Sequence, residues 1–142
     1  MIDFQQFTCA LVMPSGQETL SNVGMVSLPG VSGRIGVLPR HAPMIVKLKP
    51  GIVSLDAMAG KQMHFFVWGG IAHLGPQAVQ ILTEAFTRLD DLDPIVLNQE
   101  LTRYQSDLTG SSLEHDQAKL NYKIEIAQAM LAAIKANARS VS

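Results

Sequence analysis

The sequence predicts a β + α protein, in which an N-terminal antiparallel β-sandwich, or flattened barrel, precedes a C-terminal antiparallel two-helix hairpin. Turn-forming residues divide the chain, because ten of its eleven glycines and six of its seven prolines precede residue 77. Apolar residues also recur in short strand-like runs in the first part and with helical spacing in the second. We therefore expect a β-sandwich domain over residues 1–88 and a helical hairpin domain over 89–142.

The first part contains short apolar runs separated by turn signals, a pattern typical of an antiparallel sandwich or barrel. The runs are Phe7–Met13, Val23–Leu28, Ile35–Leu38, Met44–Leu48, Ile52–Leu55, Met63–Trp68, Ile71–Leu74 and Ala78–Leu82.

The second part contains two amphipathic helical patterns. Asp93 before Pro94 predicts an N-cap followed by proline in the first turn, and Gly110 suits the end of that helix. Ser111 and Glu114 form a capping-box pattern for the second helix. The predicted apolar stripes are Leu97, Leu101, Tyr104 and Leu108 in the first helix, and Leu113, Gln117, Leu120, Ile124, Ala127, Leu131, Ile134 and Ala138 in the second. Stripes of this heptad type predict helices that face each other across a short turn.

Charge and cysteine usage exclude some functional classes. The formal net charge is −1 and the eleven basic residues are scattered, which argues against nucleic-acid binding. Cys9 is the single cysteine, and because it alternates with apolar residues we interpret it as a buried small hydrophobe and not a nucleophile. The N-terminus has no basic region typical of a signal or transit peptide. Residues 63–83 have no Asp, Glu, Lys or Arg, but glycines, a proline and polar residues interrupt them, so we expect no direct membrane insertion.

No pattern of reactive residues predicts an enzyme. The four histidines, His41, His64, His73 and His115, show no metal-ligand spacing, and the glycine-rich segment lacks the Gly-Lys-Ser/Thr of a phosphate loop. Asp90, Asp91 and Asp93 are better explained as acids near a helix N-terminus than as acid–base catalysts. We therefore expect no catalytic residues, no metal and no cofactor.

The most informative segment is VSLPGVSGRIGVLPRHAP, from Val26 to Pro43, in which glycines and prolines punctuate apolar residues. These residue types predict two strands joined by a tight, pre-shaped loop. The segment resembles the signature of the ε subunit of bacterial F-type ATP synthases, the counterpart of the mitochondrial δ subunit. LKPG at Leu48–Gly51, WGGIAHL at Trp68–Leu74, AVQILTEAF at Ala78–Phe86 and LDDLD at Leu89–Asp93 follow in the family's order.

The resemblance implies a non-catalytic rotor subunit of the central stalk, which couples rotation of the c-subunit ring to the catalytic head through the γ subunit. It also implies a peripheral location at the cytoplasmic face of the bacterial inner (plasma) membrane. The hairpin would switch between a folded position and an extended one that inhibits ATP hydrolysis by meeting the catalytic β and α subunits. Such a switch needs two packings within a few kcal/mol of each other.

The resemblance also gives expectations for individual residues. The c-ring contact loop would comprise Gly33, Arg34, Ile35, Arg40 and His41, and we expect Arg34 and Arg40 to bracket its tip and point outward. Lys119, Lys123, Lys135 and Arg139 are candidates for inhibitory contacts, although a solvated helix surface explains them equally well. Some family members bind ATP through Ile/Leu-Asp-x-x-Arg-Ala; here Leu92 and Asp93 match, whereas Val96 and Leu97 replace arginine and alanine. Without that arginine we expect no strong ATP binding.

An alternative from another class is a free-standing β-barrel module that senses a ligand and transmits its occupancy through the helices. Such a sensor needs convergent polar groups in an apolar cavity, and the sequence nominates none. The gene's neighbourhood distinguishes the two hypotheses, because a rotor subunit is expected beside the gene for the catalytic β subunit.

Overall fold

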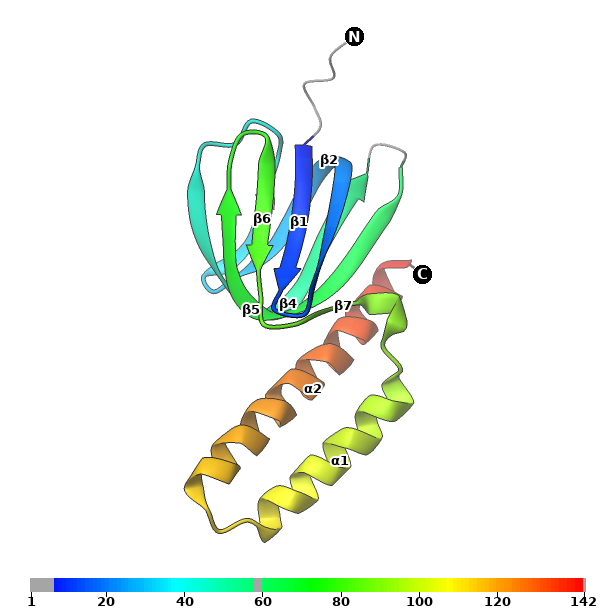
Figure 1. Ribbon diagram of the computed structural model, residues 1–142. Helices are drawn as coiled ribbons and strands as arrows, with labels where there is room; N and C mark the ends of the chain where they lie inside the picture. The colour runs from blue at the N-terminus through cyan, green and yellow to red at the C-terminus, as the bar shows by residue number, and fades with distance from the viewer. Residues whose placement is uncertain (1–6, 58–59, 142) are drawn as a thin grey trace. The chain divides into compact units, whose positions relative to one another are not determined.

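The computed structural model describes residues 7–57 and 60–141, with side chains described as far as Asn137. The chain divides into two compact units, one ending at Arg88 and the other beginning at Leu89. The first is a β-sandwich and the second a pair of α-helices, which confirms the predicted fold class. Figure 1 shows the strands and helices in chain order.

Seven strands form the sheet of the first unit within the described residues. They are β1 (Phe7–Met13), β2 (Gly16–Gly30), β3 (Gly33–Val37), β4 (Met44–Ala57), β5 (Gln62–Leu74), β6 (Ala78–Leu82) and β7 (Phe86–Arg88). Their pairings are antiparallel with one exception, since β1 runs parallel to β6 while its other edge pairs with β2. β1 accordingly lies between β6 and β2 (Figure 1).

Two of the predicted boundaries between strands are bends in continuous strands. β4 continues through Pro50–Gly51, and β5 continues through Gly69–Gly70. These interruptions face each other, because Leu48 pairs with Gly70 and Pro50 pairs with Trp68. Gly69 and Gly70 adopt positive φ values of 88° and 124°. Glycine tolerates this geometry, so the two strands turn together without losing their pairing.

The core of the sandwich comes from alternate residues of the strands. Phe7, Cys9 and Leu11 of β1 point inward, as the pleat requires. Phe65 is fully buried and meets the ring of Phe86 edge to face, with ring centroids 6.1 Å apart. Every member of this core cluster lies between residues 7 and 81, and the partly buried residues packed against it extend to Phe86. The core is therefore complete before the helices begin.

The second unit consists of α1 (Pro94–Gly110) and α2 (Glu114–Val141), preceded by a short 3₁₀ turn at Leu89–Asp91. Asp93 caps α1 by accepting a hydrogen bond from the Ile95 N–H at 2.9 Å, and Pro94 occupies the first turn, as predicted. The predicted capping box is wrong, because α2 begins at Glu114 and places Leu113, not Ser111, at the cap position. The Gln117 side chain instead donates to the Ser111 carbonyl at 2.8 Å.

The apolar stripe of α1 is at least partly buried along its whole length. In α2 the deepest burial falls at Ile126, Ala127, Met130 and Ala133, of which only Ala127 belongs to the predicted stripe. Leu113, the first member of that stripe, is 64% exposed because it precedes the helix. The apolar face of α2 is thus broader than a strict heptad pattern predicts.

Candidate partner-binding surfaces

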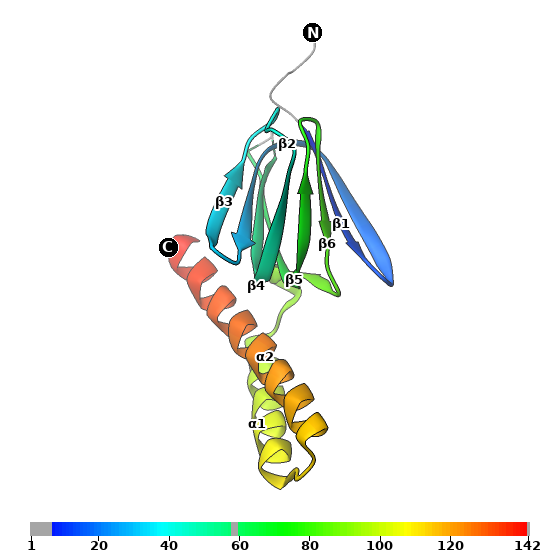
Figure 2. The same cartoon turned by 90° about the vertical axis from the view of Figure 1, so that its left-hand side faces the viewer.

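The glycine-rich segment forms a tight β-hairpin between β2 and β3. Gly30 pairs with Gly33, which leaves Val31 and Ser32 as a two-residue turn. Gly33 has a φ of 137°, a conformation that favours glycine, and Val31 at the tip is 53% exposed. The Val31 N–H donates to the Lys47 carbonyl at 3.0 Å, so the turn is tied to β4. Figure 2 shows β3 at the margin of the sandwich beside β2.

Arg34 lies on β3 and its guanidinium group is held against the sheet. Its Nε and Nη2 donate to the Ser27 hydroxyl at 3.1 and 2.9 Å, and Nη2 also donates to the Ile52 carbonyl at 2.9 Å. Partial burial lowers the pKa of Arg34 because it disfavours the charged form. These hydrogen bonds join β3 to β2 and β4, so the side chain serves the sandwich itself.

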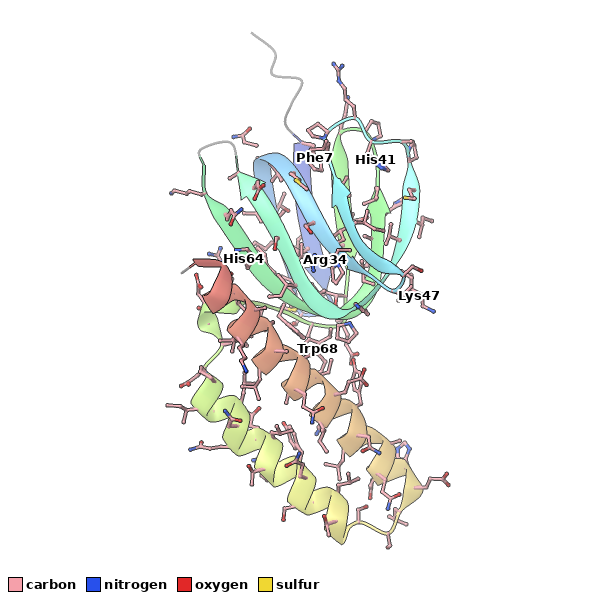
Figure 3. The ribbon with its side chains drawn as sticks, turned by 180° about the vertical axis from the view of Figure 1, so that it is seen from behind. Phe7, Arg34, His41, Lys47, His64 and Trp68 are labelled. Carbon is pink, nitrogen blue, oxygen red and sulfur yellow. The ribbon has the colours of Figure 1, made fainter. Side chains whose placement is uncertain are left out.

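Arg40 and His41 lie in the loop that follows β3. The Arg40 N–H donates to the Pro76 carbonyl at 2.8 Å, and the His41 ring contacts the Ala42 carbonyl through Nδ1 at 2.8 Å. Figure 3 shows His41 and Phe7 toward the same end of the sandwich, with Lys47 toward the other end. The prediction that Arg34 and Arg40 bracket one loop tip is therefore wrong. The extended backbone of β3 carries the chain away from the Val31–Ser32 turn before Arg40 is reached.

An apolar outer face covers neighbouring strands on the solvent side of the sheet; we define it by Ile45, Ile71, Leu82 and Val12. Ile71, Leu82 and Val12 are aligned by pairing, since Ile71 stands opposite Leu82 and Val12 is the parallel neighbour of Leu82, whereas Ile45 stands opposite His73, two positions away from the pair of Lys47 with Ile71. Ile45, Ile71 and Leu82 are 69%, 48% and 43% exposed. Lys47, His73 and Gln80 add a polar margin on the same strands. Its signal in the sequence is an apolar residue in both phases of the strand alternation, as in Ile71–Ala72 and Ile81–Leu82, which the pattern of short apolar runs does not by itself separate from the core.

The basic residues proposed for inhibitory contacts lie on α2. Lys119, Lys123 and Lys135 are exposed, and the first two line a shallow depression between the helices with Asp107 and Asp116. The Lys123 ammonium lies 5.7 Å from the centre of the Tyr104 ring, which is a cation–π contact within the hairpin. The side chain of Arg139 lies outside the described residues.

The residues of the degenerate nucleotide motif have structural positions at the start of α1. Asp93 is the N-cap, Leu97 is buried at 7% exposure, Leu92 is partly buried and Val96 is 45% exposed. The carboxylate of Asp93 is engaged by the Ile95 N–H, in agreement with its interpretation as a cap. Asp93 and Leu97 of this motif therefore have structural roles in this chain, as the N-cap of α1 and as a buried residue of its first turns.

Among the residues that the structure describes, no three His, Cys, Asp or Glu side chains gather in a way that could hold a metal ion. In the same residues no helix combines the length and apolar character needed to cross a bilayer. The uncharged segment 63–83 forms β5 and β6.

We expect the Cys9 thiol to resist modification while the sandwich is folded. Cys9 is fully buried, and burial raises its pKa from 9.0 to about 12. A thiol-specific reagent at pH 8 should leave the native chain unreacted and modify one thiol per chain in guanidinium chloride, and rapid reaction of the native chain would contradict this expectation. Because the unfolded thiol releases its proton more readily, Cys9 should also lower folding stability as the pH rises from 9 toward 12.

Comparison with known proteins identifies the relatives of this chain. Residues 6–89 match the family model described as ATP synthase, Delta/Epsilon chain, beta-sandwich domain. The ATP synthase epsilon chain of Rhizobium meliloti (strain 1021) is 32% identical over 110 residues, which cover 78% of this chain and 82% of the relative. The epsilon chain of Verminephrobacter eiseniae (strain EF01-2) is 33% identical over 110 residues, covering 78% and 80%.

Solved structures show the same fold. A chain in the cryo-EM structure of the Euglena gracilis mitochondrial ATP synthase, OSCP/F1/c-ring in rotational state 1, superposes with a TM-score of 0.78 at 23% identity. The match covers 92% of this chain and 82% of that one. A chain from the central stalk and c-ring of the Tetrahymena thermophila mitochondrial ATP synthase gives a TM-score of 0.57 at 9% identity, covering 94% and 99%. At these identities the structural matches establish the fold.

Proposed function

Because this chain belongs to the epsilon-subunit family of F-type ATP synthases, we propose that it is a non-catalytic rotor subunit of the central stalk. In this role the β-sandwich connects the c-subunit ring to the γ subunit, so that ring rotation reaches the catalytic head. A close-packed sandwich suits a part that transmits force, since protein interiors of this kind have low compressibility. We also propose that the chain associates peripherally with the cytoplasmic face of the bacterial inner membrane through these partners.

The apolar outer face is the observation that carries this proposal, and we assign it to the γ subunit. Ile45, Ile71 and Leu82 are large apolar side chains that remain exposed in the chain by itself. Exposed large apolar side chains gathered on one face beside polar residues are typical of a protein–protein interface. The patch lies on paired strands of the sheet, so its residues keep fixed spacing and can bind without ordering a loop.

We place the c-ring contact at the Val31–Ser32 turn with Gly33, Arg34 and Ile35. His41 lies at the other end of the sandwich, and Arg40 precedes it beyond the end of β3, so one face of a ring cannot meet both these residues and the turn. The tip of the turn offers an exposed valine and a serine, and Arg34 is engaged within the sheet. We therefore expect shape and backbone geometry, more than charge, to define this contact.

We propose that the hairpin restrains ATP hydrolysis by contacting the catalytic subunits, with Lys119, Lys123, Lys135 and Arg139 as candidate contacts. From Asp90 onward the chain has five basic and eight acidic residues, so any attraction to an acidic partner must come from local clusters. Lys119 and Lys123 form such a cluster, one helical turn apart on α2. Deletion of the hairpin tests this part of the proposal, because hydrolysis should then rise.

The test of the proposed γ contact is an Ile71→Glu variant of the full chain. We expect its affinity for purified γ subunit to fall at least about thirtyfold, because a charge would be buried at the centre of an apolar interface. Ile71 is 48% exposed in the chain alone, so folding should be retained and circular dichroism can verify it. A Val31→Glu variant, also at an exposed apolar residue of the sandwich, should bind γ normally. Wild-type affinity in the Ile71→Glu chain would rule out this face.

A further inference from the structure

The β2–β3 hairpin contains a defect in its backbone pairing. The Gly30–Gly33 pair closes a two-residue turn, so Gly30 and Leu28 direct their backbone hydrogen-bonding groups toward β3. Ser27 and Pro29 alternate with them and direct theirs toward β4. Ser27 does pair with Ser54 of β4, but the register between the two strands is lost between Ser27 and Gly30.

Pro29 accounts for one missing donor where the pairing stops, beside the Pro50–Gly51 bend of β4. Continuing the register of Ser27 and Ser54 by two residues would place Pro29 opposite Ile52. Proline has no backbone N–H, so it cannot donate to the Ile52 carbonyl. Pro29 is close to this part of β4, because a Cβ built on Gly51 would lie 2.9 Å from the Pro29 Cβ. The ladder between β2 and β4 thus lacks one donor beside the Val31–Ser32 turn.

Arg34 supplies a donor at this point. Arg34 is the cross-strand partner of Pro29, and its Nη2 donates to the Ile52 carbonyl at 2.9 Å. The same guanidinium group donates twice to the Ser27 hydroxyl on β2. A planar guanidinium can serve both acceptors at once, whereas the point charge of a lysine has no such fixed fork.

We infer that Arg34 is a positioning residue that replaces the backbone hydrogen bond missing at Pro29 and so fixes the Val31–Ser32 turn on the sandwich. β3 is the last strand in the sheet order, and within the described residues its strand partner is β2. Arg34 adds an attachment from β3 across β2 to β4. The role concerns the geometry of the turn and requires no contact between Arg34 and a partner.

The inference predicts an unusual rescue, which can be measured on the full chain by amide hydrogen exchange. Arg34→Met should speed exchange of the amides from Val31 to Val37 at least about tenfold, as expected for loss of charged hydrogen bonds. Pro29→Val restores an N–H opposite Ile52, so the double variant Pro29→Val/Arg34→Met should return to within about threefold of wild type. Arg40→Met removes an arginine from the same glycine- and proline-rich segment and should leave these amides unchanged.

Several results would overturn the inference. They are unchanged exchange in Arg34→Met, equal exchange in the single and double variants, or a similar change in Arg40→Met. If Arg34→Met prevents folding, Arg34→Lys replaces it in the comparison; we expect faster exchange than in wild type, corrected by Pro29→Val.

Proton pumping by the assembled enzyme distinguishes this inference from the proposed c-ring contact. The pumping measurement rests on that proposed contact, whereas the exchange measurement does not. Pumping should fall with Arg34→Met and recover in the double variant, although the guanidinium is still absent. Loss of pumping without recovery, while exchange is restored, would mean that Arg34 also meets the partner, and would overturn the statement that its role requires no such contact. Normal pumping in an Arg34→Met enzyme whose turn exchanges faster would instead refute the proposed contact and leave the inference intact.

Discussion

Replacing Gly70 with alanine should prevent the β-sandwich from forming a stable native state. Gly70 has a φ of 124°, and a Cβ built on it would lie 2.0 Å from the Leu82 carbonyl oxygen and 3.1 Å from the Thr83 Cα. Both neighbours are backbone atoms of the paired segment, so no side chain can rotate to make room. The unfavourable φ alone costs about 1–3 kcal/mol. The steric overlap adds to this and should consume most of a typical stability of about 5–15 kcal/mol.

Gly33 provides a matched control for this substitution. Its φ of 137° is as unfavourable for alanine, but a Cβ at Gly33 would meet nothing within 4 Å. Gly33→Ala should therefore show only the conformational cost, with a lowered but cooperative thermal transition by circular dichroism. Gly70→Ala should show no such transition. Equal melting temperatures for the two variants would mean that the close approach of β5 to the end of β6 does not limit the structure.

Ending the chain after Leu89 should raise ATP hydrolysis by the assembled enzyme while proton pumping continues. The core cluster of the sandwich lies within residues 7–81 and its partly buried neighbours extend to Phe86, so the shortened chain keeps the residues that stabilise this unit. Coupling free energies in regulated proteins are typically about 1–3 kcal/mol. If the hairpin restrains hydrolysis by a free energy of this size, its removal should increase the rate of ATP hydrolysis at least about fivefold. Hydrolysis and pumping should be measured in the same membranes.

A second variant tests whether charge on the hairpin contributes to this effect. Lys119→Glu/Lys123→Glu reverses the exposed basic pair of α2 and should give part of the increase seen on truncation. Because Lys123 also contacts the Tyr104 ring, circular dichroism should verify that the helices persist in this variant. If hydrolysis rises in the truncated enzyme but not in the Lys119→Glu/Lys123→Glu enzyme, inhibition depends on the presence of the hairpin and not on these two charges. Unchanged hydrolysis in the truncated enzyme would refute an inhibitory role and leave structural coupling as the main proposed function.

Local signals in the sequence were sufficient for some elements and insufficient for others. The Asp93–Pro94 start of α1 was predictable because capping depends on neighbouring residues. Pro50–Gly51 and Gly69–Gly70 carry the local signals of strand ends but are bends, because each strand is kept continuous by its pairing with the other. The parallel pairing of β1 with β6 likewise has no local signal.

The same distinction applies to the candidate surfaces. Arg34 and Arg40 are close in sequence, which favours one loop tip, but Arg34 lies near the start of β3 and Arg40 follows its end, where the Arg40 N–H donates to the Pro76 carbonyl. The internal role of Arg34 depends on Ile52, which lies in β4 and is joined to Arg34 only through folding. The apolar outer face could have been found from the sequence, because Ile71 and Leu82 occupy the strand phase that should face water.

The parallel pairing of β1 with β6 has a consequence for the newly made chain. Thr8 pairs with Ala78, seventy positions further along, so one edge of the N-terminal strand stays without its partner until β6 has been synthesised. At about 5–20 residues per second this interval lasts several seconds. Throughout it Phe7, Cys9 and Leu11 lack their neighbours from β6, and an unpaired apolar edge is a site for chaperone binding or aggregation. The hairpin, whose contacts are local, can close soon after its last residues appear.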